Sequence, residues 1–202
     1  TAYKALTYAI AVNEANAKMF RVVACPTAGS CGVMPGTMCA VAEELKLDDE
    51  AMLRGFFMGA GIGNVITNQA CVAGAVGGCQ AEVGSAAAMA AGAVVAMLEG
   101  TTKQAINAVA LCLKNVLGLV CDPVGGLVEV PCVKRNGIYA VHALSAAEMA
   151  MAGLISQIPV DEVIEAMDRI GRALPSTLRE TSEGGLATTE TGRRIAKQLA
   201  EM

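Results

Sequence analysis

The sequence lacks tryptophan and has a single histidine, three tyrosines and three phenylalanines among its 202 residues. Charged residues make up only 17% of the chain, and the formal net charge is -4. This composition leaves no basic stripe of the kind that binds nucleic acid, so a small molecule is the expected partner. The shortage of aromatic side chains also means that small side chains and methionine must fill the core.

Glycine and methionine are abundant, with 22 and 11 residues, and hydrophobic residues reach 54%. Apolar positions at helical spacing predict an all-α fold, a single compact domain over residues 1–202 with a buried Ala/Gly-rich central helix. The segment 55–98 carries one charge, Glu82, but Gly77 and Gly78 interrupt it. We therefore expect buried core helices and no membrane span.

The periodicity and the capping signals also predict where helices begin and end. Thr101 and Gln104 form a capping box, and Asn64, Asn68 and Cys71 form a polar row that is expected to satisfy buried backbone or to line the site. The segment 118–137 has no helical pattern, and an irregular stretch of that length is expected to wrap a functional site. The predicted helices cover residues 3–20, 35–45, 48–58, 64–75, 82–99 and 101–117, and further helices contain Ile138, start near Pro159 and start near Gly192.

Eight cysteines are too few to serve as a disulfide scaffold in a chain with this much apolar material, and no signal peptide is evident at Thr1. A reducing cytoplasm is therefore the expected location. Cys79, Cys121 and Cys132 lie next to glycine or proline, whereas most other cysteines lie in apolar runs. Three thiolates would leave one iron of a four-iron cluster free to accept a substrate oxygen. Their spacing alone matches no compact ferredoxin or zinc signature.

Four motifs are far more specific than this spacing. They are Pro-Thr-Ala-Gly-Ser-Cys-Gly at 26–32, Gly-Gly-Cys-Gln-Ala-Glu-Val-Gly at 77–84, the Cys-Asp-Pro-Val-Gly-Gly segment at 121–136, and Arg-Glu-Thr-Ser-Glu-Gly-Gly-Leu at 179–186. Together they closely resemble the alpha chain of bacterial iron-sulfur-dependent L-serine dehydratase, in order and over essentially the whole sequence.

The resemblance implies a 4Fe-4S cluster held by Cys79, Cys121 and Cys132. It implies a carbon–nitrogen lyase, L-serine ammonia-lyase, that converts L-serine to pyruvate and ammonia in amino-acid degradation and gluconeogenesis. The open iron of the cluster would bind the substrate hydroxyl as a Lewis acid. The general base is not identified by the sequence.

Substrate-binding residues are expected in two places. The 26–32 loop precedes a predicted helix N-terminus, where free N–H groups favour an anion such as the substrate carboxylate. After Cys132, an arginine suits bidentate carboxylate recognition and an asparagine suits an amide contact. Glu82 is expected either to orient the substrate amino group or to cap its helix, and His142 is expected to be a packed residue. The predicted substrate-binding residues are Thr27, Ala28, Gly29, Ser30, Arg135 and Asn136.

The resemblance also implies partners. Members of the family carry a Ser-His-Thr-Met-Gly-Pro motif in a beta chain or domain, and this motif does not occur here. Alpha chains of the family also have a further helical stretch ahead of the position of Thr1. We therefore expect a fragment that works with a beta chain in an oligomer, and that is inactive alone.

Four other functions remain open from the residues. An iron–sulfur cysteine desulfidase would use the same site for a thiol leaving group. An electron-transfer protein would need a fourth ligand from one of the remaining cysteines. A pyridoxal-phosphate enzyme would use Lys114 or Lys134, but the strand–helix alternation of those folds is missing. A helical interaction domain with inert cysteines would bind no metal.

Overall fold

The structure is a computed structural model, and it describes residues 1–201. Over these residues the chain is helical and forms no strand, apart from one isolated bridge between Cys121 and Arg179, so the predicted all-α fold is confirmed. The helices are α1 (Ala2–Ala17), α2 (Val33–Leu45), α3 (Asp49–Gln69), α4 (Gly74–Gly77), α5 (Ser85–Met97), α6 (Thr102–Lys114), α7 (Cys132–Met151), α8 (Val160–Ala173) and α9 (Glu190–Ala200).

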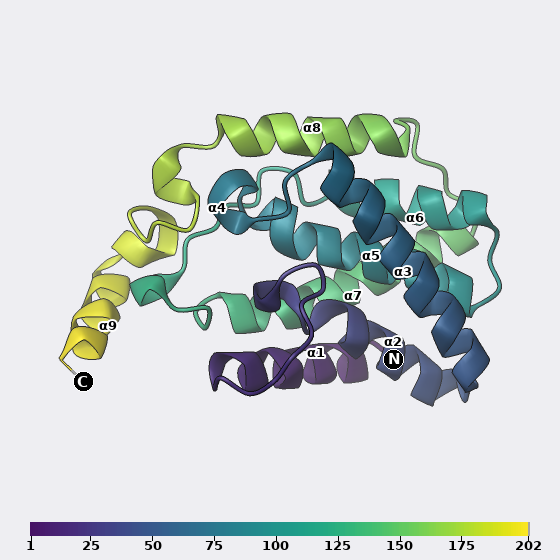
Figure 1. Cartoon of the computed structure of the whole chain (residues 1–202), viewed down its shortest axis with the longest axis horizontal. Helices are drawn as coiled ribbons and strands as arrows, with labels where there is room; N and C mark the ends of the chain where they lie inside the picture. The colour runs from purple at the N-terminus through teal and green to yellow at the C-terminus, as the bar shows by residue number, and fades with distance from the viewer. Residues whose placement is uncertain (202) are drawn as a thin grey trace.

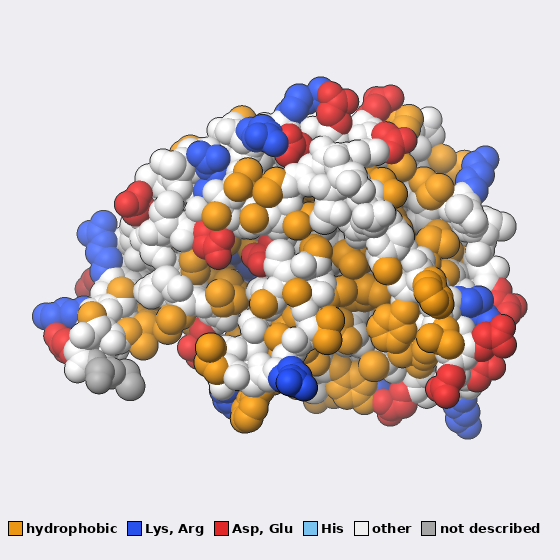
Figure 2. Space-filling model, in the orientation of Figure 1, with side chains coloured by type: hydrophobic (Ala, Val, Ile, Leu, Met, Phe, Trp, Pro, Cys, Tyr) orange, Lys and Arg blue, Asp and Glu red, His pale blue; other side chains and the backbone are white. Residues whose placement is uncertain are grey.

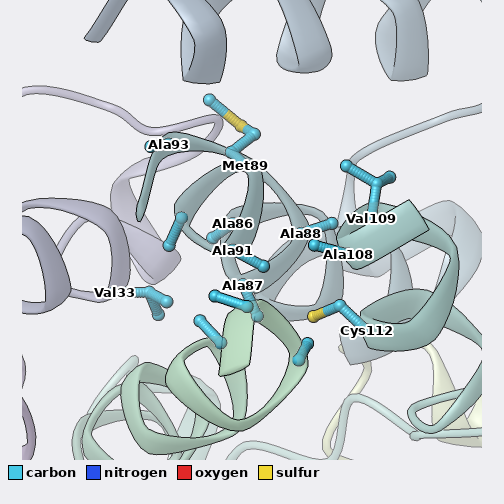
Figure 3. Close-up of a cluster of buried hydrophobic side chains, with 14 of the residues drawn as sticks. Val33, Ala86, Ala87, Ala88, Met89, Ala91, Ala93, Ala108, Val109 and Cys112 are labelled. Atoms are coloured by element: carbon cyan, nitrogen blue, oxygen red, sulfur yellow. The ribbon is translucent and has the colours of Figure 1, made fainter. Parts of the chain in front are cut away.

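Helix α5 forms the centre of the fold, and all of its residues are buried. Helices α2, α3, α6 and α7 surround it (Figure 1). Alanines of α5 lie directly beside Val33 of α2 and beside Ala108, Val109 and Cys112 of α6 (Figure 3). Small side chains permit this close approach, because each helix presents little more than its backbone to its neighbours. The predicted Ala/Gly-rich central helix is thus confirmed.

The stretch Gln80–Met97 is long and apolar enough to cross a membrane by length and composition, yet 89% of it is buried within the fold. Such burial is the usual property of a core helix, for which no lipid is needed to cover the apolar side chains. The first turn of this stretch, Gln80–Gly84, is a π-helical turn that leads into α5. π-helical turns of this kind are frequent at functional sites.

Two predicted helices are in fact one. The sequence pattern predicted one helix over 48–58 and another over 64–75, but α3 continues from Asp49 to Gln69. Gly55, Gly59 and Gly63 repeat every fourth residue, and methionine side chains of α2 and α5 pack into the space that they leave. The predicted role of Asn64 and Asn68 is also wrong: both side chains are exposed, and the Asn68 amide donates to the Asn64 carbonyl oxygen at 2.8 Å.

Helix α7 begins at Cys132 and not near Ile138, so the irregular segment is shorter than predicted. The capping box of α6 is confirmed, because the Thr101 side chain accepts from Gln104 N and the Gln104 side chain accepts from Thr101 N. After α8 the chain forms irregular turns, and α9 then packs on the short turns Val124–Gly126 and Gly185–Thr188 at one end of the molecule (Figure 1).

Candidate metal and substrate site

Two of the three predicted cysteine ligands, Cys79 and Cys121, come together with Glu82, and Cys132 lies outside this group but close enough for the charge on Cys79 to affect its thiol. Cys79 precedes the π-helical turn, Cys121 lies in the irregular segment and Cys132 begins α7, and their exposed fractions are 3%, 3% and 8%. The Sγ atoms of Cys79 and Cys121 and a carboxylate oxygen of Glu82 all lie within 4.8 Å of one another. All three cysteines are free thiols. Buried thiols without disulfide partners are the ligand set that iron–sulfur clusters and other thiophilic metals select.

The thiols influence one another's ionisation. A hydrogen bond from the Cys121 thiol lowers the pKa of Cys79, and the Arg135 charge acts in the same direction against the opposing effect of burial. The pKa of Cys121 is raised, first by that same hydrogen bond and then by burial. Burial, followed by the charge on Cys79, raises the pKa of Cys132 to about 12. One thiolate is therefore favoured without metal, and metal binding must release protons from the other two.

Backbone hydrogen bonds hold the Cys121 loop in place. Cys121 N donates to the Leu178 carbonyl oxygen at 2.9 Å, and Glu180 N donates to the Cys121 carbonyl oxygen at 2.8 Å. The motif at 179–186 therefore pairs directly with the motif that begins at Cys121. On the other side of the site, Gln80 is fully buried and links the Cys79 turn to two elements: its amide donates to the Met167 carbonyl oxygen at 2.8 Å and accepts from Gly118 N at 2.9 Å.

An ion pair joins the same loops to α7. Arg135 Nη2 lies 2.9 Å from Asp122 Oδ1, and Arg135 Nη1 donates to the Val120 carbonyl oxygen at 3.1 Å. The other oxygen of Asp122 accepts from Leu186 N at 2.9 Å. Arg135 was predicted to bind the substrate carboxylate; in the structure its side chain is 18% exposed and is already paired with Asp122 beside the thiols.

Asn136 is 1% exposed and joins α7 to the 26–32 loop. Its side-chain oxygen accepts from Gly32 N at 3.0 Å, and its side-chain nitrogen donates to the carbonyl oxygens of Gly29 at 2.8 Å and Cys132 at 3.0 Å. These bonds fix the loop relative to Cys132. They also occupy the Oδ1 and Nδ2 atoms of Asn136, the side chain that was predicted to contact substrate.

The predicted substrate loop meets the cysteines through Glu82. Thr27 Oγ1 donates a hydrogen bond to the Glu82 carboxylate. A Cβ added to Gly29 would lie 2.6 Å from Glu82 Oε1, so glycine is required for this approach. Ser30 is buried and donates to the Cys25 carbonyl oxygen at 3.2 Å, while Ala28 is exposed. The carboxylate of Glu82 thus lies between the loop and the metal-ligand candidates.

Burial raises the pKa of Glu82, the Thr27 hydrogen bond opposes this effect, and the negative charge of Glu180 adds to it. Glu180 was not among the predicted site residues, although it lies in the motif at 179–186 that carries part of the resemblance. Its approach to the site depends on the pairing of two loops that are distant in sequence. That pairing produces no periodic signal that a sequence could reveal.

The remaining cysteines and the histidine have other surroundings. Cys112 is fully buried in the core, where burial raises its pKa (Figure 3). His142 Nε2 makes a 2.9 Å hydrogen bond with the Cys112 carbonyl oxygen, so the prediction of a packed histidine is confirmed. Cys31 is buried and accepts from the Asn13 amide at 3.8 Å.

An apolar groove of about 1130 Å³ lies apart from these thiols, between α3, α6 and α8. Leu53, Phe57, Val65 and Ile106 line it and are each at least 45% exposed. Hydrophobic side chains are gathered on the face of the molecule that α3 crosses (Figure 2). The groove contains no cysteine, so it is separate from the candidate metal site.

Comparison with known proteins relates the chain to one family. Residues 1–187 match the family described as serine dehydratase alpha chain. The chain is 56% identical over 195 residues to a probable L-serine dehydratase alpha chain of Bacillus subtilis, covering 96% of this chain and 65% of that protein. It is 55% identical over 196 residues to a probable L-serine dehydratase alpha chain of Latilactobacillus sakei, covering 97% and 94%. With an L-serine dehydratase of Escherichia coli it shares 41% identity over 182 residues, but spans only 40% of that longer protein.

Proposed function

Because the chain belongs to the serine dehydratase alpha-chain family, we propose that it forms the metal-binding part of an L-serine dehydratase. This carbon–nitrogen lyase would convert L-serine to pyruvate and ammonia. The observation that supports the proposal most strongly is that the buried, unpaired thiols of Cys79 and Cys121 meet the Glu82 carboxylate, to which Thr27 of the 26–32 loop donates a hydrogen bond.

Cys79, Cys121 and Cys132 would hold the 4Fe-4S cluster. Their chemistry fits it, since all three are free thiols and they come from separate, firmly anchored segments. Gly74 keeps the space beside them open, because a Cβ there would lie 3.0 Å from Cys121 Sγ. When bound, the cluster would supply a Lewis-acidic iron for the hydroxyl that serine loses.

The residues of the chain would bind and orient serine. The 26–32 loop is proposed to receive the carboxylate, with Thr27, Ala28, Gly29 and Ser30 nearest to it. For Arg135 and Asn136, the contacts support an indirect part in substrate binding. Arg135 neutralises Asp122 and favours the Cys79 thiolate, and Asn136 holds the loop against Cys132.

The chain is further proposed to act in the cytoplasm as an oligomer with a beta chain that supplies the remaining catalytic groups. The names of the alpha-chain relatives support a division of the enzyme into two chains. The longer Escherichia coli relative, of which this chain spans 40%, is consistent with the same parts joined in one chain.

The proposal can be tested by measuring iron and sulfide after anaerobic reconstitution. We expect Cys79→Ala, Cys121→Ala and Cys132→Ala each to abolish cluster assembly, because each removes one of three ligands. Cys112→Ala is the matched control, since it removes a buried thiol from the core and should keep the full iron content. Full iron content in any of the first three variants would contradict the ligand assignment.

The substrate is tested separately, with the chain and its beta chain assembled. Pyruvate should form from L-serine faster than from L-cysteine. A preference for cysteine, with release of sulfide, would instead support a desulfidase. A cluster that is reduced and reoxidised reversibly in a redox titration, and that responds to neither amino acid, would support electron transfer.

A further inference from the structure

Two carboxylates and a thiol converge on one point beside Gly74. A Cβ built on this glycine would lie 3.0 Å from Cys121 Sγ, 3.2 Å from Glu82 Oε2 and 3.3 Å from Glu180 Oε2. These atoms come from three segments that are distant in sequence. The absence of a side chain at Gly74 lets these oxygen and sulfur atoms approach the backbone closely.

The Glu82 carboxylate is held in place from the opposite side. It accepts a hydrogen bond from the Thr27 hydroxyl, and a Cβ added to Gly29 would lie only 2.6 Å from its Oε1 atom, so a side chain there would displace the carboxylate. The Glu82 carboxylate is therefore held in place between the 26–32 loop and Cys121.

Glu180 reaches the same point through an unusual backbone conformation. Its φ angle is +66°, which costs a non-glycine residue about 1 kcal/mol or more. The hydrogen bond from Glu180 N to the Cys121 carbonyl oxygen holds this conformation. Glu180 is exposed to solvent, whereas Glu82 is partly buried, so Glu180 lies on the solvent side of this point.

No ion pair neutralises either carboxylate within residues 1–201. The guanidinium nearest the thiols, that of Arg135, is already paired with Asp122. The guanidinium of Arg179 donates to the Val76 carbonyl oxygen at 3.5 Å. Two carboxylates beside the Cys79 and Cys121 thiols therefore concentrate negative charge at the candidate metal site, and such charge favours a cationic group.

The proposed substrate carries such a group at the required position. In L-serine the ammonium and the departing hydroxyl are attached to neighbouring carbon atoms, so a group that binds the ammonium must lie next to the metal ligands. Glu82 meets this condition, because a carboxylate oxygen lies within 4.8 Å of the Sγ atoms of Cys79 and Cys121.

We propose that Glu82 and Glu180 bind the α-ammonium group of the substrate and thereby select amino acids over analogues that lack the amino group. This inference rests on the proposed dehydratase function. It assigns the two carboxylates to substrate binding, and no electron or proton transfer step is attributed to them.

The test uses the reconstituted alpha chain assembled with its beta chain. We would measure the KM for L-serine and the inhibition constant of 3-hydroxypropanoate, which is serine without its amino group. Glu180→Gln and Glu82→Gln should raise the KM for serine about 10- to 100-fold, because each removes a charge-assisted hydrogen bond. Inhibition by 3-hydroxypropanoate should stay within about 2-fold of the parent, and Glu180→Asp should restore part of the serine affinity.

Glu183→Gln is the matched control, because Glu183 is an exposed glutamate in the same loop and should leave both constants unchanged. Equal weakening of serine and 3-hydroxypropanoate would overturn the inference, since it would indicate only a structural role. An unchanged KM for serine in both Gln variants would also overturn it.

Iron and sulfide content separates this inference from the function on which it rests. Both Gln variants should keep the parent iron content. Loss of iron from a Gln variant would indicate metal ligation and overturn the inference, while the dehydratase proposal stands. A parent enzyme that forms no cluster and no pyruvate would contradict both.

Discussion

Replacing Asn136 by alanine would remove the side chain that joins α7 to the 26–32 loop. Three hydrogen bonds are lost, to Gly32 N and to the carbonyl oxygens of Gly29 and Cys132. Each such bond contributes about 1 kcal/mol, and a buried N–H left without a partner adds a further penalty of about 1 kcal/mol or more. Asn136 is only 1% exposed, so water has little access to the groups left unpaired.

The expected loss for Asn136→Ala is therefore about 3–4 kcal/mol in the free energy of unfolding. For a domain of this size 1 kcal/mol corresponds to about 2–4 °C, so Tm should fall by about 6–16 °C. Circular dichroism under anaerobic, reducing conditions would follow the transition. Ser145→Ala is the control, because Ser145 is an exposed residue of the same helix whose hydroxyl donates to the Val141 carbonyl oxygen at 3.2 Å. Its Tm should change by less than about 2 °C.

Hydrogen exchange would locate the effect. The Gly32 amide should exchange faster in Asn136→Ala, because its hydrogen-bond acceptor is gone. Amides in α5 should lose protection only by as much as the free energy of global unfolding falls, because Asn136 makes its hydrogen bonds to Gly32, Gly29 and Cys132 and none to α5. A Tm within about 1 °C of the parent, with unchanged Gly32 exchange, would refute the idea that Asn136 organises the loop.

Other perturbations follow from the same contacts. Arg135→Met should cost about 3–5 kcal/mol in urea unfolding, because Asp122 is left buried without its charge partner; a loss below 1 kcal/mol would contradict the role of the pair. Gly61→Ala on α3 should stabilise the chain by about 1 kcal/mol, because alanine has the higher helix propensity and its Cβ would lie in open space. Gly36→Ala should destabilise the chain, because its Cβ would lie 2.5 Å from the backbone of α1. Asp168→Asn should lower stability near neutral pH, because a hydrogen bond from a neighbouring guanidinium lowers the pKa of this carboxyl below 3.8 in the folded state. The stability that Asp168 adds is present above the pKa that it has in the unfolded chain, and is lost as the pH falls through its lower pKa in the folded state. The free energies of unfolding of parent and variant should therefore converge at low pH in acid-unfolding curves.

Much of the fold was predictable because the helices follow simple rules. The capping box at Thr101 and the Ala-rich run after Glu82 each gave a local signal that the structure bears out. The division of α3 was wrong because glycine lowers helix propensity locally, whereas packing of methionines against Gly55, Gly59 and Gly63 stabilises the continuous helix. Tertiary contacts of this kind leave no trace in local propensity.

The site was predictable only in part, for a similar reason. Motif resemblance indicated the three cysteines and the 26–32 loop, and the structure brings Cys79, Cys121 and Thr27 together around Glu82. The resemblance did not distinguish residues that contact substrate from residues that position other parts of the site. Asn136 has the chemistry of a substrate ligand, but only the structure shows that its hydrogen bonds are made within the chain.

We propose that Cys79, Cys121 and Cys132 hold a cluster with one iron open to L-serine. A Mössbauer spectrum of the chain, reconstituted anaerobically with labelled iron and sulfide, tests this claim most directly when it is recorded with and without L-serine. We expect the signal of one iron to shift on addition of serine while the others remain unchanged. A complete cluster whose spectrum ignores serine, also with the beta chain present, would contradict it.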